Sequence, residues 1–425
     1  MRIAVIGSGI SGLVVGWRLH RHCDLSVFEA GSHIGGHVNT VPVRFSDGRP
    51  ELARPHDRAS IPVDTGFIVH NPVNYPLLCR VFATLGVATQ PSEMSFSVAC
   101  SRSGVEWAGN SLASVFAQPG NLLSPGFWSM LRGIVRFNAQ ARSRLLAEGN
   151  EDLPLGEFLT SAGISRRAIE HYVIPIGSAI WSAPAARILE FPARRFASFL
   201  ANHGMLQIGA DRPEWRTVVG GSWRYVKAIT KDWSDRIRLD TPVRRVRRLP
   251  DGVEVVSDQG PERFDRVVFA CHSDQALALL ESPHDAERTV LEALPYQANP
   301  AALHHDERLM PKQRIAWSAW NHRVGDGDAA VVTYWMNRLQ RFTAPRPLLV
   351  TLNAEARIER ERIIYETTYH HPRFTTGAAA AQGQRRAISG ADHIHYCGAY
   401  WGNGFHEDGC ASGLAVAAEL GQPWP

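Results

Sequence analysis

The first 40 residues alternate short apolar runs with a glycine-rich turn. Residues 2–6 and 25–28 are apolar runs of strand length, and residues 13–19 carry apolar side chains at helical spacing. A strand, a glycine turn, a helix and a second strand in this order predict a βαβ unit at the start of the chain.

The middle of the chain changes to a helical pattern. From residue 110 to 204, apolar positions recur every three or four residues between Gly-Asn and Pro-Gly turns, as in Phe127, Trp128, Leu131, Ile134 and Val135. We therefore predict a helical subdomain at 110–204.

The second half of the chain reads as short strands. Beyond Gly220, a hairpin signal at Asp251-Gly252 lies among four predicted short strands, at 236–239, 243–247, 253–256 and 266–269. Later apolar runs lie at 315–320, 331–335, 348–352 and 363–369. They do not alternate with helices and therefore predict an antiparallel sheet. The chain closes with a predicted strand at 394–397 and a helix of small residues at 409–420.

Composition narrows the class of protein. The chain has 425 residues, of which 44% are hydrophobic and 20% charged, which is typical of a soluble globular protein with two interlocking domains. Its 45 basic and 41 acidic residues give a net charge of +4, too small and too scattered to indicate nucleic-acid binding.

Six cysteines show no CxxC pair, so neither a disulfide framework nor a zinc site is predicted, and a reducing cytoplasm fits best.

The chain begins with a short apolar run followed by glycines, so no secretory signal is expected. No apolar run of about 18 residues occurs, so no segment is expected to span a bilayer.

The glycine turn carries a specific chemistry. Gly7-Ser8-Gly9-Ile10-Ser11-Gly12 is a G-x-G-x-x-G directly after a strand and at the start of a helix. The first glycine permits the turn, the second lets the backbone approach a pyrophosphate, and the third packs helix against strand. Glu29, at the end of the second strand, is placed to bind a ribose 2′-hydroxyl, which disfavours NADP. Gly35-Gly36 would let the chain approach the diphosphate from its other side.

The string from Arg2 to Gly36 resembles the FAD fingerprint of the glutathione-reductase-type flavoproteins, and within them the amine oxidase, phytoene desaturase and protoporphyrinogen oxidase group. That group often has arginine after the glycine doublet, where this chain has His37. Three further segments match this group. Val63 to Phe67 resembles the segment beneath the flavin ring, and Gly220-Gly221-Ser222 resembles the glycine turn before the chain returns to the cofactor domain. Thr241-Pro242-Val243 resembles the strand that contacts adenine.

The C-terminal segment from Tyr396 to Gly413 is similar to the closing FAD motif of the group, in which a helix N-terminus points at the flavin. The group usually has an acidic residue after the glycine, but Ala399-Tyr400-Trp401 follows Gly398 here, so Asp408 or backbone amides are the candidates for the ribityl phosphate side. Cys397 is not at the linkage position of the group, and noncovalent FAD is expected.

The resemblance implies a set of FAD-contacting residues. They are Gly7, Ser8, Gly9, Ile10, Ser11, Gly12, Glu29, Ala30, Gly35, Gly36, His37, Thr65, Gly66, Phe67, Val243, Gly398, Ala399, Phe405, Asp408 and Gly409.

The predicted fold is α/β (α+β overall), with a glutathione-reductase-type Rossmann FAD domain and a substrate domain of mixed or antiparallel sheet and helices. We assign residues 1–75, 221–295 and 391–425 to the FAD domain, and residues 76–220 and 296–390 to the substrate domain.

Histidines offer candidate catalytic groups. His406 and His272 are expected in loops at the carboxyl ends of FAD-domain strands, where open α/β sheets bind ligands, although structural roles for both are equally open. His304-His305 and His370-His371 do not predict a metal site, because adjacent histidines on a strand point to opposite faces.

Aromatic side chains could line a substrate tunnel or belong to the core, namely Trp181, Trp401, Tyr400, Tyr75 and Tyr334. The stretch from Leu122 to Phe137 has an apolar face with Arg132 and Arg136, and could lie on a membrane surface or pack as an ordinary amphipathic helix.

The function implied by the resemblance is FAD-dependent removal of hydride from a carbon. We predict dehydrogenation or desaturation of a lipid acyl chain, in a tunnel that opens beside 110–204 through an arginine-rich mouth. The strings from Ala270 to Leu277 and from Gly404 to Gly409 resemble a bacterial branch often encoded beside cyclopropane-fatty-acyl synthase-like methyltransferases, so a neighbouring lipid methyltransferase is a candidate partner.

Two alternatives stay open at this point. One is an amine oxidase, although His305-Asp306 stands where that subfamily commonly has a lysine. The other is a non-redox flavoprotein, either an isomerase or a partner of the methyltransferase. Peripheral contact with the inner face of the membrane is also open.

Overall fold

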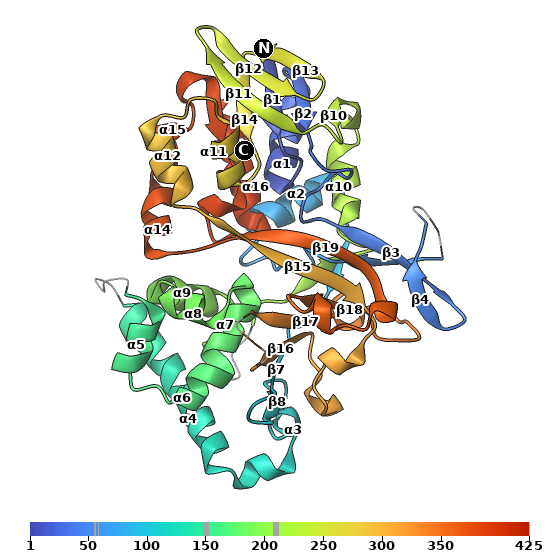
Figure 1. Cartoon of the computed structure of the whole chain (residues 1–425), viewed down its shortest axis with the longest axis vertical. Helices are drawn as coiled ribbons and strands as arrows, with labels where there is room; N and C mark the ends of the chain where they lie inside the picture. The colour runs from blue at the N-terminus through green and yellow to red at the C-terminus, as the bar shows by residue number, and fades with distance from the viewer. Residues whose placement is uncertain are drawn as a thin grey trace.

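The computed structural model describes residues 1–54, 57, 59–147, 153–206, 212–325, 327 and 329–424. The described chain forms two regions stacked along the long axis of the molecule (Figure 1). The upper region contains both ends of the chain, and the lower region contains the longest strands and most of the middle helices.

A parallel sheet is the framework of the upper region. Its strands, in spatial order, are β10 (Ile237–Arg238), β2 (Asp24–Phe28), β1 (Arg2–Ile6), β14 (Arg266–Phe269) and β20 (Ile394–Tyr396). The sheet is assembled from three distant parts of the chain, and the βαβ unit predicted at the N-terminus forms its centre, with α1 at Ile10–Leu19 as the crossover helix. Buried apolar side chains on both faces explain why β1 reads as an unbroken apolar run.

A three-stranded antiparallel sheet lies beside the parallel one, and its hairpin turn is at Asp251, as the sequence predicts. Its strands are β11 (Val243–Leu249), β12 (Gly252–Ser257) and β13 (Gly260–Phe264). The other helices of the upper region are α2 (Pro76–Leu85), α10 (Trp223–Thr230), α11 (Ser273–Leu279), α12 (Asp285–Glu292), α14 (Thr376–Gly383), α15 (Arg385–Ile388) and α16 (His406–Glu419).

A seven-stranded sheet forms the roof of the lower region. In spatial order its strands are β19 (Ile363–Pro372), β15 (Tyr296–His304), β18 (Leu349–Leu352), β17 (Val331–Trp335), β16 (Trp320–Val324), β7 (Phe96–Cys100) and β8 (Glu106–Ala108). The sheet is mixed, because β16 pairs with β7 in parallel. The helix α13 (Met336–Leu339) follows β17.

Two smaller sheets join the regions. One consists of β4 (Arg49–Leu52), β3 (Thr40–Ser46) and β5 (Ile61–Asp64), and the other of β6 (Thr89–Pro91) and β9 (Arg216–Val218).

The helical subdomain predicted at 110–204 is present as a series of short helices around one apolar core. They are α3 (Leu112–Val115), α4 (Pro125–Gln140), α5 (Leu155–Ser161), α6 (Arg166–Ala168), α7 (Ile174–Trp181), α8 (Ala185–Glu190) and α9 (Ala193–Asn202). None of the described helices is long and apolar enough to cross a membrane.

The strand predicted at 315–320 is wrong. The structure has a 3-10 turn, η6, at Arg314–Ala316, and the strand β16 begins only at Trp320. The Trp317 indole donates a hydrogen bond to the Pro311 carbonyl, and the Asn321 side chain accepts from the backbone N–H of Ser318, so side chains hold this apolar segment in turns. The apolar content of this segment therefore does not indicate an extended backbone.

The close packing of α1 depends on Gly16. A β-carbon at this position would lie 2.5 Å from the buried ring of Trp233. We expect Gly16→Ala to lower the free energy of unfolding by about 1–3 kcal/mol, because a rigid indole cannot give way. Gly383→Ala is the matched control, because Gly383 also lies in a helix but has nothing within 4 Å of the added carbon. Chemical denaturation of both variants tests this, and an equal effect would contradict it.

Candidate active site

A cavity of about 960 Å³ lies between the parallel sheet and the roof of the lower region. Gly7, Glu29 and Ala270 line it, and each directly follows a strand of the parallel sheet; Gly398 also lines it, two residues after the end of β20. The cavity therefore opens at the carboxyl ends of the strands, where open α/β sheets bind their ligands.

The N-terminal glycine motif forms one wall of the cavity. Gly7 has φ +106° and its N–H donates to the Phe28 carbonyl at 2.8 Å, so the chain turns sharply between β1 and α1. A β-carbon at Gly12 would lie 2.1 Å from the Gly7 carbonyl oxygen, so this glycine is required for packing. A β-carbon at Gly9 would meet nothing within 4 Å, so the missing side chain leaves a cradle at the start of a helix.

Glu29 closes this end of the cavity. Its carboxylate accepts hydrogen bonds from the Ser8 N–H at 2.9 Å, the Ser8 hydroxyl at 2.6 Å and the Gly31 N–H at 2.8 Å. The carboxylate is thus fixed beside the glycine turn by two backbone N–H groups and one hydroxyl.

The Gly35-Gly36 doublet approaches the same turn from the opposite side. Both residues have positive φ, and a β-carbon at Gly36 would lie 3.2 Å from the α-carbon of Gly9. The two glycine segments therefore flank one narrow space, as a diphosphate between them would require.

The segment after β5 forms the floor. Thr65, Gly66 and Phe67 line the cavity, and the Thr65 hydroxyl lies 2.6 Å from the hydroxyl of Tyr369. The Phe67 ring stacks on the imidazole of His406, with ring centroids 3.8 Å apart. His406 begins α16, so the N-terminus of this helix points at the same floor.

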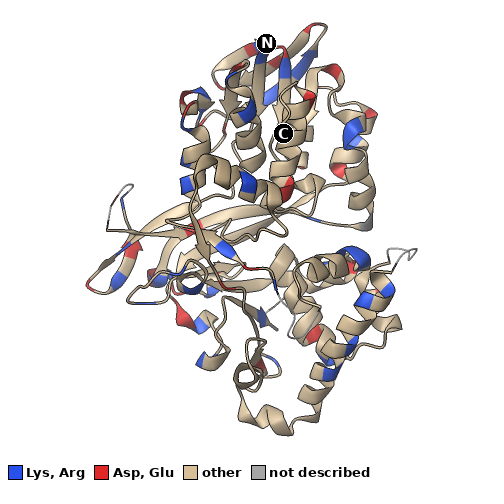
Figure 2. Cartoon of the chain, turned by 180° about the vertical axis from the view of Figure 1, so that it is seen from behind, with Lys and Arg blue, Asp and Glu red and all other residues tan. Residues whose placement is uncertain are grey.

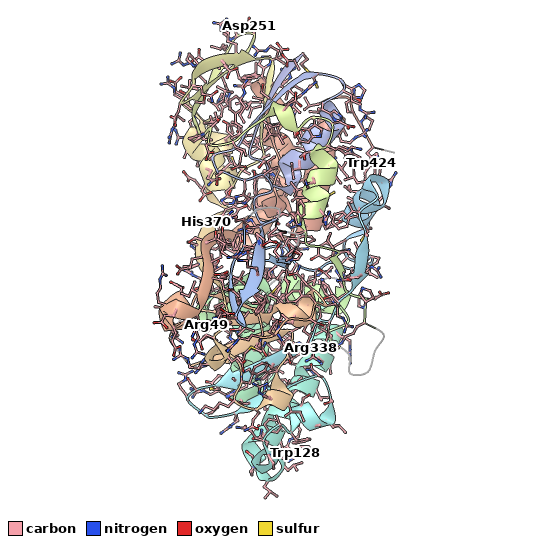
Figure 3. The ribbon with its side chains drawn as sticks, turned by 90° about the vertical axis from the view of Figure 1, so that its right-hand side faces the viewer. Arg49, Trp128, Asp251, Arg338, His370 and Trp424 are labelled. Carbon is pink, nitrogen blue, oxygen red and sulfur yellow. The ribbon has the colours of Figure 1, made fainter. Side chains whose placement is uncertain are left out.

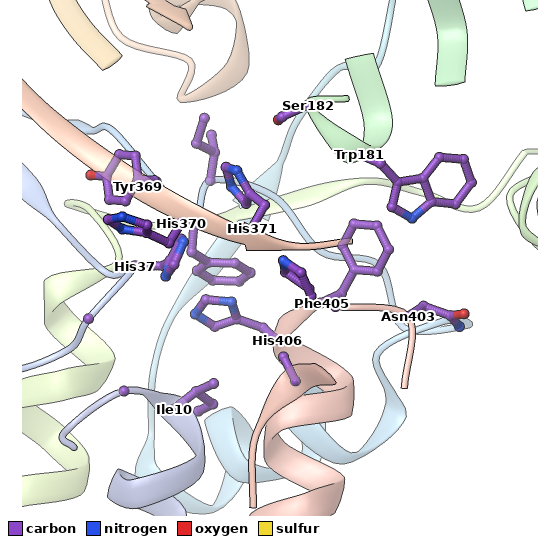
Figure 4. Close-up of a pocket in the computed structure, with 18 of the residues that line it drawn as sticks. Ile10, His37, Trp181, Ser182, Tyr369, His370, His371, Asn403, Phe405 and His406 are labelled. Atoms are coloured by element: carbon purple, nitrogen blue, oxygen red, sulfur yellow. The ribbon is translucent and has the colours of Figure 1, made fainter. Parts of the chain in front are cut away.

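Six histidines line the cavity, namely His37, His203, His272, His370, His371 and His406. Figure 4 labels four of them, His37, His370, His371 and His406. The rings of His37 and His371 lie 5.3 Å apart, and those of His272 and His370 lie 5.8 Å apart. In the described part of the chain, Nε2 of His37 and Nε2 of His406 are buried and have no hydrogen-bond partner.

Burial favours the neutral imidazole at His37, His272, His371 and His406. It lowers the pKa of His37 and of His272 from 6.5 to about 4, and that of His371 to about 3, with a further contribution from neighbouring histidines. The pKa of His406 is lowered well below its ordinary value for the same reasons. The group can accept protons but carries little positive charge at neutral pH.

An apolar arm extends from the floor toward the helices α7 and α9. Its lining consists mainly of aliphatic, aromatic and thioether side chains: Met94, Phe96, Ile176, Ala179, Ile180, Trp181, Phe199, Met205, Trp215, Trp320, Tyr334 and Leu352. Glu93 and Glu214 also line the arm, but each carboxylate pairs with an arginine, Arg338 and Arg216 respectively. No lysine lines the described part of the cavity.

Most of the residues expected to contact a cofactor lie together in this cavity. They are Gly7, Ser8, Gly9, Ile10, Ser11, Glu29, Ala30, Gly35, Gly36, His37, Thr65, Gly66, Phe67, Val243, Gly398, Ala399 and Phe405, with His272 and His406 beside them.

Three of the expected residues do not line the cavity, namely Gly12, Asp408 and Gly409. The Asp408 carboxylate accepts the Phe405 N–H at 2.9 Å and so caps α16. Gly409 and Gly12 instead permit close packing, since a β-carbon at Gly409 would lie 2.7 Å from the Ile10 side chain.

The aromatic candidates divide into two groups. Trp181, Tyr75 and Tyr334 line the cavity, whereas Tyr400 and Trp401 pack into the core of the upper region. The arginine-rich mouth is not present, because Arg212 is the one arginine among the described lining residues. The expectation failed because the arginines of the helical region lie on its outer surface or bond to the protein itself, as Arg136 does to the Ala162 carbonyl.

The His304-His305 pair takes no part in the site. His304 is buried, its Nε2 lies 2.7 Å from the Thr351 hydroxyl, and its Nδ1 accepts the Asp306 N–H. Within the described residues no group of three or more His, Cys, Asp or Glu side chains is arranged to hold a metal ion.

Sequence reasoning missed the role of His370 and His371, which it considered only as metal ligands. Alternation along β19 would have placed one of them toward the upper region, but both line the cavity near the end of the strand at Pro372. It also missed Met94, Phe96, Phe199 and Trp215, whose apolar character does not distinguish a cavity wall from a core.

Residues 10–304 match the family model of flavin containing amine oxidoreductases. The chain belongs to this family. It is therefore an FAD-dependent oxidoreductase. No curated protein sequence matches the chain.

Solved structures share its fold at low identity. A putrescine oxidase variant with redesigned cofactor binding is 15% identical, with a TM-score of 0.69 over 99% of this chain and 98% of that one. Cyclohexylamine oxidase from Brevibacterium oxydans IH-35A is 17% identical, with a TM-score of 0.68 over 99% of each chain. A CLA-producing fatty acid isomerase from P. acnes is 14% identical, with a TM-score of 0.66 over 99% and 98%.

The residues around the cavity fit FAD. The Gly9 cradle and the N-terminus of α1 would hold the diphosphate, Glu29 would bind the adenosine ribose, and Phe67 would lie beneath the flavin ring. Cys397 is fully buried and does not line the cavity, which agrees with noncovalent binding.

We expect Gly9→Val to abolish FAD retention while the protein still folds, because the added side chain would occupy the cradle. Gly383→Val is the control for the general cost of valine at a helical glycine. Flavin content after purification and the circular dichroism of both variants test this. Acid precipitation of wild type should leave FAD in the supernatant, and normal flavin content in Gly9→Val would overturn the assignment.

The neutral histidines predict a pH dependence of the apoprotein. Their folded-state pKa values lie below 6.5, so the unfolded chain binds more protons as pH falls from 6.5 toward 4, and stability is lost in that range. Each such histidine contributes up to about 1.4 kcal/mol per pH unit. Urea denaturation should show a shallower loss for His37→Gln than for wild type, whereas His22→Gln, at an exposed position, should match wild type. Equal slopes for all three proteins would contradict this.

Proposed function

We propose that the protein removes hydrogen from a lipid acyl chain and yields a more unsaturated product. The observation that carries the proposal is the apolar arm, which leads from the floor of the cavity toward α7 and α9. An acyl chain has no charge at the reacting carbon, so it needs a long apolar channel that brings a C–H bond to the flavin. FAD, when bound, supplies the hydride acceptor for this chemistry.

The charges around the arm favour this substrate over an amine. Both carboxylates of the arm are paired with arginines, so neither is free to hold an ammonium group. The resemblance of residues 270–277 and 404–409 to the branch encoded near cyclopropane-fatty-acyl synthase-like methyltransferases supports the same substrate class.

His406 is our candidate for accepting the substrate proton. Its Nε2 is buried without a partner among the described residues, and its low pKa keeps it neutral. Its stacking on Phe67 holds the ring beside the floor of the cavity. His272 is the second candidate, with its ring stacked on Tyr296 at 4.1 Å.

The test is anaerobic reduction of the bound flavin by candidate substrates. We expect a phospholipid with long acyl chains, presented in detergent, to bleach the flavin absorbance and to lose two hydrogen atoms, as mass spectrometry would show. An aliphatic amine should not reduce the flavin. Reduction by the amine alone would overturn the proposal in favour of an amine oxidase, and a rearranged lipid without net electron flow would favour an isomerase.

Variants in the same assay test where the substrate binds and which residue takes its proton. Ile180→Asp places a charge in the apolar arm and should weaken reduction by lipid without loss of FAD, whereas Ile174→Asp on the same helix lies outside the lining and should not. His406→Ala should slow reduction by about 10²–10⁴-fold if the imidazole takes the proton. An unchanged rate would return His406 to a structural role.

A further inference from the structure

The lower end of the molecule exposes an unusual concentration of large apolar side chains. Leu112 is 80% exposed, Leu122 51%, Leu123 88%, Trp128 41% and Val135 53%. We call these five residues the apolar tip. Trp128 lies at the extremity of the molecule in Figure 3. More than half of the exposed large hydrophobic side chains of the described chain lie in the tip or at Ile315, on the η6 turn that contacts α3.

The apolar tip is held rigidly and does not consist of loose side chains. The Trp128 indole N–H donates to the Leu122 carbonyl at 2.9 Å, and the Phe116 ring packs on Trp128 with centroids 5.6 Å apart. The Ser124 side chain accepts the Phe127 N–H and so caps α4 at the base of the tip. The apolar surface is therefore formed before any partner binds.

Along the chain, the charges from the tip through α4 are of one sign. Between Glu106 and Glu148 the sequence has four arginines, Arg132, Arg136, Arg142 and Arg144, and no aspartate or glutamate. Arg132 is exposed and follows Trp128 by four residues on α4, while Val135 follows by seven, so the outer face of this helix alternates apolar and basic groups. Figure 2 shows this end of the molecule without acidic colour on α4.

We propose that the apolar tip docks on an anionic membrane surface. A projecting end with aliphatic side chains, an interfacial tryptophan and basic neighbours fits a flat layer of anionic headgroups. A second copy of this chain fits poorly, because a symmetric contact would bring Arg132 against its counterpart with no carboxylate from α4 to pair with. This inference rests on the proposed function, because a membrane is where the acyl chains of the proposed substrate are found.

Flotation of the FAD-loaded protein with vesicles tests the proposal. We expect binding to vesicles of phosphatidylglycerol and phosphatidylcholine, weaker binding to phosphatidylcholine alone, and a decrease with added salt. Leu123→Asp and Trp128→Glu should each weaken binding about tenfold or more. Val73→Asp is the control, because Val73 is 67% exposed and lies before α2, away from the tip.

Flavin content shows that each variant is folded. Absence of vesicle binding at low salt, or an equal loss in Val73→Asp, would overturn the proposal. A change of oligomeric state in the tip variants, seen by light scattering, would overturn it in favour of contact between copies. Turnover of lipid in detergent tests the proposed function separately, so vesicle binding without turnover supports docking and defeats the lipid substrate.

Discussion

The position of the active site depends on one buried carboxylate, that of Asp64. It is fully buried, and it accepts hydrogen bonds from the Ser222 N–H and hydroxyl, the Thr40 hydroxyl and the Gln340 amide at 2.5–3.0 Å. These donors come from three parts of the chain that lie far apart in sequence. Because the residues 65–67 that follow Asp64 form the floor of the cavity, the carboxylate fixes that floor against both regions of the molecule.

Burial of the Asp64 carboxylate costs free energy and therefore requires specific hydrogen-bond partners. Burial raises the pKa of Asp64 to about 6, although its hydrogen bonds act in the opposite direction. Each buried donor left without an acceptor costs about 1–3 kcal/mol, so the partners hold one another in place. The same constraint explains Gly220-Gly221, where both residues have positive φ and a β-carbon at Gly221 would lie 2.6 Å from the Thr40 side chain. The glycine pair therefore permits the close approach that brings Thr40 and Ser222 to the Asp64 carboxylate, and it does not line the cavity.

The sequence predicts the cofactor half of the site better than the substrate half. Residues 2–36 need only short-range rules, because each glycine has a local reason and Glu29 follows its strand directly. The strand β15 was not predicted, because Gln297, Asn299 and Pro300 break the apolar pattern, yet Asn299 is buried and its amide bonds to the Ser182 carbonyl. Its neighbours, which are distant in sequence, make it a strand. The residues of the apolar arm likewise come from many elements, and only the tertiary fold separates them from the core.

His37 shows how a single departure from the family pattern changes the electrostatics of the site. The related flavoproteins often have arginine after the glycine doublet, a cation at every accessible pH, whereas burial keeps the His37 imidazole neutral. Among the described lining residues Arg212 is the one arginine, and it lies with Pro213 and Trp215 in the segment that reaches the apolar arm. A diphosphate at the Gly9 cradle therefore meets backbone N–H groups, the α1 dipole and titratable imidazoles in place of a fixed cation. Because a nearby anion favours the imidazolium form, a diphosphate bound at this cradle would act on the pKa of the nearest imidazole in the direction opposite to burial. The fixed donors for such an anion are therefore the backbone N–H groups and the α1 dipole, where an arginine would supply a permanent charge.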